Sequence, residues 1–123
     1  MTAPMLRALR GATTCEADTP DDITEAVHEL VLTMMERNDL AHDDVVSVIF
    51  TSSADLTSAF PATAARSIGF GDIPLLCASE IAVPGSMNRC IRILMHVYTT
   101  RERADVRHVY LRSAQSLRDD LPG

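Results

Sequence analysis

One long amphipathic helix is the feature that most restricts how this 123-residue chain can fold. Between Pro20 and Asn38, apolar side chains recur at every third or fourth position, which is the spacing of one face of an α-helix. Thr19 is a good N-cap, and Asp21 and Asp22 oppose the positive end of the helix dipole. No second long stretch of the sequence has this period. The apolar face of the helix therefore needs a sheet to pack against.

The remaining elements are mainly predicted β-strands, which are rich in β-branched residues or alternate in polarity. These strands cover residues 5–10, 45–51, 73–78, 90–98 and 106–111. A short helix is predicted over residues 62–68, between Pro61 and Gly69. This order predicts an α+β fold, in which a mixed five-stranded sheet packs on one long helix plus short helices. The length predicts a single domain over residues 1–123.

The predicted strand over residues 90–98 has two different faces. One face is entirely apolar, whereas the other carries Arg92, Leu94, His96 and Tyr98. The chain offers no second amphipathic helix to cover this mixed face. A sheet face left open by its own chain often belongs to an oligomer interface, and a solvated face is the alternative.

The charge of the chain limits the classes of partner. The net charge of −6 argues against a broad electrostatic contact with nucleic acid. Every basic side chain is an arginine, so a lysine Schiff base and a P-loop lysine are excluded. Arginine binds carboxylates through two parallel hydrogen bonds, which favours a small anionic ligand. We expect a cytoplasmic protein without membrane contact, since the sequence has neither a secretory signal nor an apolar run of membrane-spanning length.

Few residues stand out as chemically active. Cys15, Cys77 and Cys90 are odd in number and widely spaced, which disfavours a disulfide framework or a zinc site. No nucleophile and base, and no metal-ligand cluster, can be recognised by spacing. Arg92 lies in the middle of a strand, where a guanidinium needs a partner. That partner is either a carboxylate such as Glu80 or an anionic ligand in a pocket.

Several short blocks of sequence are spread in order over almost the whole chain. They cover residues 10–14, 55–56, 59–62, 74–80, 90–92, 107–111, 117–118 and 120–121. In composition and order these blocks resemble the monofunctional, non-helical chorismate mutases, whose α+β subunits form trimers. The resemblance implies isomerisation of chorismate to prephenate by a Claisen rearrangement, in the shikimate route to phenylalanine and tyrosine.

The implied reaction explains the sparse inventory of reactive groups. A Claisen rearrangement occurs within one dianionic molecule and needs no cofactor, metal, covalent intermediate or proton transfer. The resemblance further implies a homotrimer that forms a pseudo-α/β-barrel, with chorismate and prephenate bound at the subunit interfaces. The uncovered face of the strand over residues 90–98 fits such an interface.

The resemblance assigns catalytic roles to Arg92 and Glu80. Arg92 would donate to the ether oxygen, which gains negative charge in the transition state. Glu80, together with the region of Cys77, would hold the substrate hydroxyl and balance the positive charge. The implied substrate-binding residues bind a carboxylate, line the ring or close the pocket, and they are Arg10, Phe60, Ala62, Arg66, Leu75, Leu76, Cys77, Tyr110, Leu117 and Arg118. Thr63 departs from the family, where lysine is common, so one positive charge is missing at the pocket edge.

Two other functions stay open at this point. Small trimeric imine/enamine deaminases have a similar fold and also place arginine at subunit clefts, although they need a water-activating group. A non-catalytic trimer could instead bind an anionic metabolite and regulate a partner. The presence of both Arg92 and Glu80 favours the mutase, because a simple binding protein has no use for a donor aimed at an ether oxygen.

Overall fold

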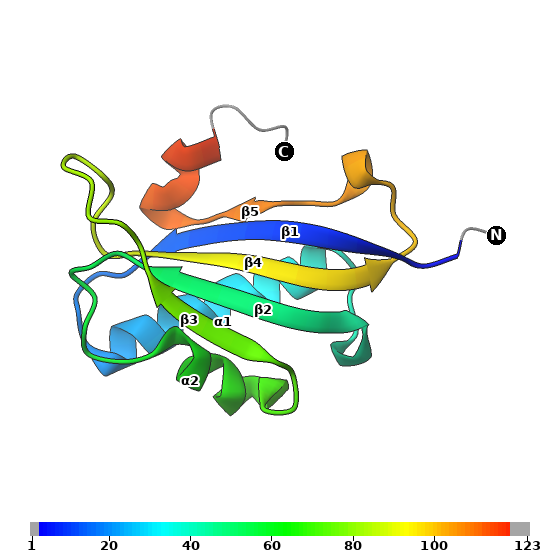
Figure 1. Cartoon of the computed structure of the whole chain (residues 1–123), viewed down its shortest axis with the longest axis horizontal. Coiled ribbons are helices and arrows are strands. Elements are labelled where there is room, and N and C mark those ends of the chain that lie inside the picture. Colours follow the sequence, from blue (N-terminus) through cyan, green and yellow to red (C-terminus); the bar gives the residue numbers. More distant parts are fainter. Residues whose placement is uncertain (1–2, 119–123) are drawn as a thin grey trace.

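The computed structural model describes residues 3–118, which form one mixed sheet with helices on one of its faces (Figure 1). The strands are β1 (Met5–Thr14), β2 (Val45–Ser52), β3 (Leu75–Ser79), β4 (Cys90–Thr99) and β5 (Val109–Tyr110). Their order in the sheet is β3-β2-β4-β1-β5. β4 is antiparallel to β1 and β2, whereas β3 is parallel to β2 and β5 is parallel to β1. The predicted α+β fold with a mixed five-stranded sheet is confirmed.

The helices are α1 (Pro20–Arg37) and α2 (Pro61–Ala65). Single turns and short helices follow at η1 (His42–Asp44), η2 (Arg66–Phe70), η3 (Arg103–Asp105) and η4 (Arg112–Arg118). The predicted helix over residues 62–68 is thus α2 and the turn after it, where Gly69 takes a φ of 99° that glycine adopts readily. Within residues 3–118, no helix has the length and apolarity needed to cross a membrane.

Helix α1 has the limits that its sequence predicts. The Thr19 hydroxyl accepts a hydrogen bond from the Asp22 backbone N–H at 3.1 Å, and Asn38 is the C-cap. The buried face of α1 packs on the sheet through Ile23, Ala26, Val27, Leu30, Val31 and Met34. Gly11 of β1 lies directly beneath it, because a Cβ at this position would come within 2.5 Å of the Met34 sulfur. The missing side chain lets the helix approach the sheet closely.

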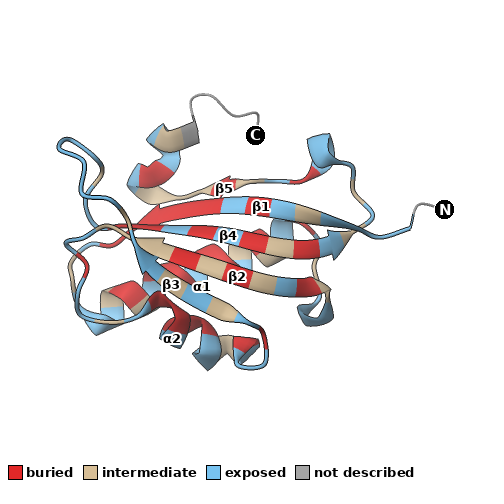
Figure 2. Cartoon of the chain, in the orientation of Figure 1, coloured by how far each residue is buried: buried red, intermediate tan, exposed pale blue. Residues whose placement is uncertain are grey.

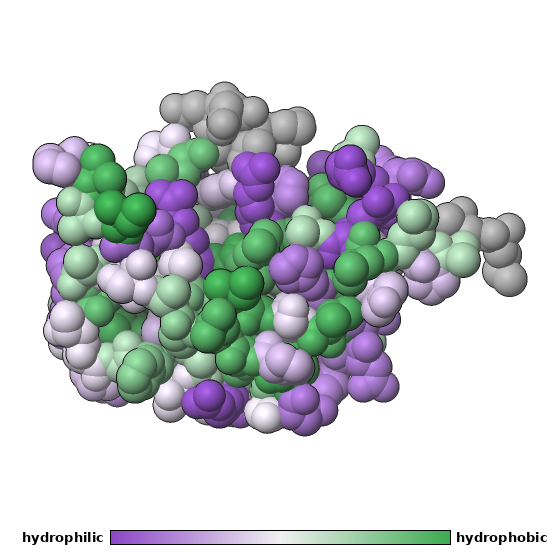
Figure 3. Space-filling view, in the orientation of Figure 1, coloured by the Kyte–Doolittle hydropathy of each residue, from purple (hydrophilic) through white to green (hydrophobic). Residues whose placement is uncertain are grey.

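The two faces of β4 differ as expected. The side chains of Ile91, Ile93, Met95 and Val97 are buried against the helices. On the other face Leu94 is 37% exposed and Tyr98 is 49% exposed. Figure 2 shows buried and exposed residues alternating along this strand, and Figure 3 shows hydrophobic side chains gathered on the open side of the sheet. No element of the described residues covers that side.

Strand β1 is longer than predicted. The sequence predicts a strand over residues 5–10 that ends at Gly11, but the strand continues to Thr14. It continues because β4 pairs with it along its whole length, from Met5 opposite Thr99 to Thr14 opposite Cys90. Gly11 therefore lies inside the strand, where it makes room for α1.

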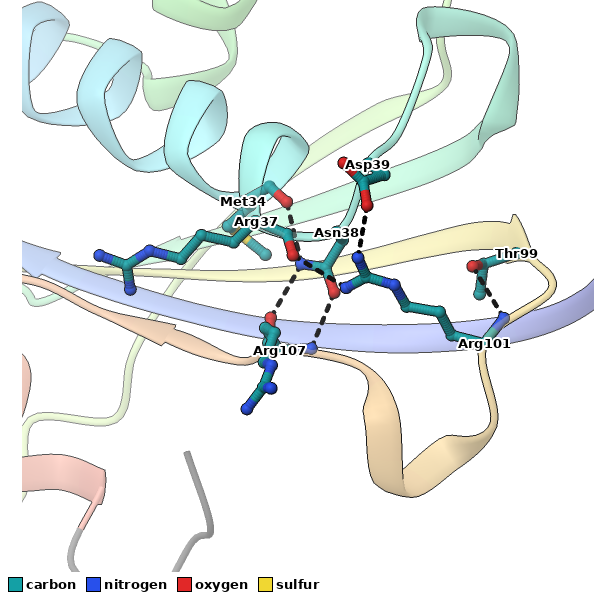
Figure 4. A network of polar contacts seen from close by, with 7 residues as sticks. All are labelled: Met34, Arg37, Asn38, Asp39, Thr99, Arg101 and Arg107. Carbon is teal, nitrogen blue, oxygen red and sulfur yellow. Dashed lines mark hydrogen bonds and ion pairs between the residues drawn. The ribbon is translucent and has the colours of Figure 1, made fainter.

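Strand β5 is shorter than predicted, with only Val109–Tyr110 of the expected residues 106–111. The backbone of Arg107 is paired with a side chain instead of a strand (Figure 4). Asn38 Oδ1 accepts from the Arg107 N–H at 2.7 Å, and Asn38 Nδ2 donates to the Arg107 carbonyl at 2.9 Å. A side-chain amide thus takes the two backbone groups that a longer strand would use.

Candidate active site

Arg92 projects from the start of β4 on the open face, and Glu80 is the residue that follows β3. Arg92 Nε lies 3.8 Å from Glu80 Oε2, and the two side chains are 48% and 38% exposed. The sequence leaves open whether Arg92 pairs with a carboxylate or binds an anionic ligand. In the structure its guanidinium has Glu80 as a carboxylate partner and also remains open to a ligand. An ion pair this exposed contributes little to stability.

A cleft of about 300 Å³ surrounds this pair on the open face. Its polar lining side chains are those of Arg10, Thr51, Glu80, Arg92 and Tyr110, and we call it the arginine cleft. The strand register builds the cleft as one row across the sheet. Thr51 of β2 lies opposite Arg92 of β4, and Ala12 of β1 lies opposite both Arg92 and Tyr110. The small Ala12 side chain leaves the space between the larger ones empty.

Two further predicted residues, Phe60 and Cys77, line a separate hollow of about 340 Å³ at the β3 edge of the sheet. We call it the Phe60 hollow, and Leu56, Ala59, Phe60, Pro61 and Cys77 are among its lining residues. Phe60 is 71% exposed, a high fraction for a large aromatic side chain.

The Phe60 hollow lies toward the side of the sheet that carries the helices. The buried Ala62 of α2 donates its N–H to Cys77 Sγ at 3.4 Å, and Cys77 packs against the hydrophobic core. The arginine cleft opens on the other side. Within one chain, the predicted site residues are thus divided between two surfaces.

The other predicted substrate-binding residues lie outside the arginine cleft. Leu76 is exposed on β3, whereas its neighbour Leu75 is half-buried against the core. Arg66 is exposed at the C-terminal end of α2. Leu117 is half-buried in η4, and the side chain of Arg118 lies outside the described residues. The chain alone therefore brings together Arg10, Glu80, Arg92 and Tyr110, but not the full predicted set.

Two features of the site were missed by the sequence analysis. Thr51 lines the arginine cleft and donates a hydrogen bond to Glu80, although the sequence predicts it only as the end of a strand. The second feature is the loop after Glu80, which lines a further hollow of about 370 Å³ together with Arg92. Ile81 and Val83 in this loop are exposed, and no local pattern in the sequence identifies the loop as part of the site.

The titratable groups near the cleft do not form a nucleophile and base. Burial raises the pKa of the Cys15 thiol to about 11, and burial also raises the pKa of Cys90 despite the opposing charge of Arg92. Both thiols therefore stay protonated at neutral pH. Burial lowers the pKa of His108, and the charge of Arg10 acts in the same direction. Among residues 3–118, no group of three or more His, Cys, Asp or Glu side chains could hold a metal ion.

The arginine cleft can bind an anion and recognise one hydroxyl group. Arg10 and Arg92 supply guanidinium donors, which suit carboxylates. Tyr110 supplies a phenol, and Glu80 is the carboxylate acceptor of the cleft. These groups favour the binding and electrostatic stabilisation of a small anionic molecule.

The chain is similar to known proteins over most of its length. A family model described as chorismate mutase type I matches residues 6–121. The chain is 52% identical over 118 residues to chorismate mutase AroH of Thermus thermophilus, covering 95% of this chain and 97% of that protein. It is 38% identical over 118 residues to chorismate mutase AroH of Bacillus subtilis, covering 95% of this chain and 93% of that protein.

A solved structure of a chorismate mutase from Clostridium thermocellum is also similar, with a TM-score of 0.88 and 46% sequence identity. The similarity covers 89% of this chain and 98% of that chain. The match is thus one of fold as well as of sequence, and it extends over nearly the full length of each relative. The chain belongs to the chorismate mutase type I family.

Proposed function

We propose that this protein catalyses the rearrangement of chorismate to prephenate, on the route to phenylalanine and tyrosine. The observation that carries the proposal is the arginine cleft, in which Arg10, Glu80, Arg92 and Tyr110 come together from distant parts of the chain. Membership of the chorismate mutase type I family supports it independently. We further propose that residues 1–123 act as one domain in the reducing cytoplasm, where the free thiols of the chain are stable.

The reaction explains why the cleft consists of donors and one acceptor. In a Claisen rearrangement of chorismate, an ether C–O bond breaks while a C–C bond forms in the same molecule. No group enters or leaves, so the protein has to hold the compact reactive conformer and stabilise the changing charge. Arg92 would donate to the ether oxygen as its negative charge grows, a contribution of about 3–4 kcal/mol for one preorganised donor.

The remaining residues of the arginine cleft would bind the substrate. Arg10 and Tyr110 would hold a carboxylate, and Glu80 would accept a hydrogen bond from the substrate hydroxyl. Glu80 also offsets the charge of the nearby guanidinium, with Arg92 Nε 3.8 Å from its Oε2. This carboxylate favours a ligand that presents a hydroxyl beside its negative groups.

We propose a homotrimer whose active sites lie between adjacent subunits in a pseudo-α/β-barrel. Each site would combine the arginine cleft of one chain with the Phe60 hollow of its neighbour. Support comes from the division of the predicted residues between two surfaces of one chain, and from the uncovered apolar side chains around Leu94 and Tyr98. In such a site Phe60 and Ala62 would form an apolar wall, Arg66 would add positive potential, and Leu75, Leu76 and Cys77 would line the ring. Leu117 and Arg118 would help to close the pocket.

The test follows the ultraviolet absorbance of chorismate in buffer that contains a chelator and no cofactor. We expect saturable conversion to prephenate by the wild-type protein. Arg92→Ala should lower kcat about 10²- to 10³-fold, because it removes a donor used in the transition state. Light scattering should show the same oligomer for both proteins. A folded wild-type oligomer that leaves chorismate unchanged would refute the proposal and favour a protein that only binds an anionic metabolite.

A further inference from the structure

The side chain of Thr51 connects the central strands of the sheet to Glu80. Thr51 lies near the end of β2 and faces Arg92 across the β2–β4 ladder. Its hydroxyl donates a hydrogen bond to Glu80 Oε2. The same oxygen lies 3.8 Å from Arg92 Nε. One carboxylate oxygen therefore receives both contacts.

Glu80 needs such a partner because little else holds its side chain. Its backbone is fixed, since the Glu80 N–H donates to the Ser52 carbonyl at 2.8 Å. Beyond it begins the largely exposed loop over residues 81–89. The ion pair with Arg92 joins two long, partly exposed side chains, and such pairs restrict geometry weakly.

Thr51 is suited to hold the carboxylate in place. A β-branched side chain has few χ1 rotamers, so its hydroxyl occupies a defined position relative to the strand. The strand itself is central, because β2 is paired on both sides by β3 and β4. A hydroxyl has one proton to donate, and here that proton goes to Oε2. The other carboxylate oxygen, Oε1, remains available to accept a proton donor in the cleft.

We propose that Thr51 is a positioning residue, which orients the Glu80 carboxylate so that Oε1 can accept the hydroxyl of the substrate. This rests on the proposed mutase function and deepens it by naming what determines hydroxyl recognition. The substrate hydroxyl takes no part in the bonds that break and form, so we expect it to be bound about equally in the ground state and in the transition state. Loss of the positioning contact should therefore raise KM more than it lowers kcat.

The first experiment compares Thr51→Val with Thr51→Ser in the chorismate assay. Valine keeps the shape and removes the donor, whereas serine keeps the donor. We expect Thr51→Val to raise KM about tenfold with kcat within about twofold of wild type, and Thr51→Ser to restore KM. Ser47→Ala is the matched control, since Ser47 lies on β2 and its hydroxyl contacts His96 Nδ1 at 3.4 Å. This control should keep the wild-type KM.

The second experiment separates positioning from a general structural role. Thr51→Val is combined with Glu80→Ala, and the double variant is compared with Glu80→Ala alone. If Thr51 acts through Glu80, the second substitution should change kcat/KM less than twofold, because the carboxylate that it positions is already gone. Circular dichroism and light scattering check that all variants fold and assemble alike.

Several outcomes would overturn the proposal. Equal KM values for wild type and Thr51→Val would refute it while leaving the mutase function intact. A full tenfold loss from Thr51→Val in the Glu80→Ala background would show that Thr51 acts independently of Glu80. A wild-type protein without any activity on chorismate would refute the proposed function itself, and this inference with it.

Discussion

Successive residues of β1 have different tasks because strand side chains alternate between the faces of the sheet. Arg10 lines the arginine cleft on the open face. Gly11 faces α1, where a Cβ would lie 2.5 Å from the Met34 sulfur. Ala12 returns to the open face and leaves room between Arg92 and Tyr110. The short sequence Arg10-Gly11-Ala12 thus serves the site on one side and the core on the other.

At this residue scale, Gly11→Ala should destabilise the protein by about 1–3 kcal/mol, because the added methyl group forces the Met34 side chain or the helix to move. The free energy of unfolding in urea measures the effect. Gly71→Ala is the control, since nothing lies within 4 Å of a Cβ at Gly71. Equal unfolding free energies for the two variants would show that the α1–sheet contact is looser than described.

Contacts between elements determine where the elements end. Asn38 caps α1 and is buried, with 3% exposure. Its amide also donates to the Met34 carbonyl at 2.9 Å, so one side chain joins the last turn of α1 to the backbone before β5. Arg101 adds a second connection, from its guanidinium to the Arg37 carbonyl at 2.8 Å and to Asp39 Oδ2 at 2.6 Å (Figure 4). These contacts hold the segment that leads to Tyr110.

At the scale of elements, Asn38→Ala should destabilise the protein by about 1–3 kcal/mol, because the Arg107 N–H and carbonyl lose their partner in a partly buried position. Chemical denaturation measures this loss. Asn88→Ala, in the exposed loop after β3, should change stability by less than about 0.5 kcal/mol. An Asn38→Ala protein as stable as wild type would mean that water replaces the amide without cost.

At the scale of the whole molecule, one chain carries two separate parts of the proposed site. The arginine cleft opens on the uncovered face, and the Phe60 hollow lies at the β3 edge on the side of α2. A substrate bound by both parts has to lie between two chains. A closed ring of subunits with heterologous interfaces, in which the arginine cleft of one chain meets the Phe60 hollow of the next, would satisfy this requirement.

Co-expression of two inactive variants tests this arrangement. Arg92→Ala removes the catalytic guanidinium from the arginine cleft. Phe60→Asp places a negative charge in the Phe60 hollow, where it would repel a dianionic substrate. If each site combines the two parts from different chains, random mixing of equal amounts should restore about a quarter of the wild-type sites.

Co-expression of Arg92→Ala with Glu80→Ala is the matched control for this experiment. Both substitutions affect the same cleft, so no mixture of these chains contains an intact site, and activity should stay at the level of the single variants. Absence of recovery in the first mixture, with mixed oligomers verified by mass spectrometry, would show that the site lies within one chain.

The sequence by itself determined the elements whose signals are local. The period of α1, its cap at Thr19 and the two unlike faces of β4 all depend on residues close together in the chain, and all are confirmed. The ordered blocks along the chain also identified the family, which the comparisons confirm.

Only the tertiary structure decided features that depend on distant partners. β1 extends past Gly11 because β4 pairs with it, and β5 is short because Asn38 occupies the backbone of Arg107. The contact of Thr51 with Glu80 likewise joins the ends of two strands 29 positions apart. Periodicity describes which face a side chain takes, whereas a hydrogen-bond partner from another element depends on how the elements pack in space.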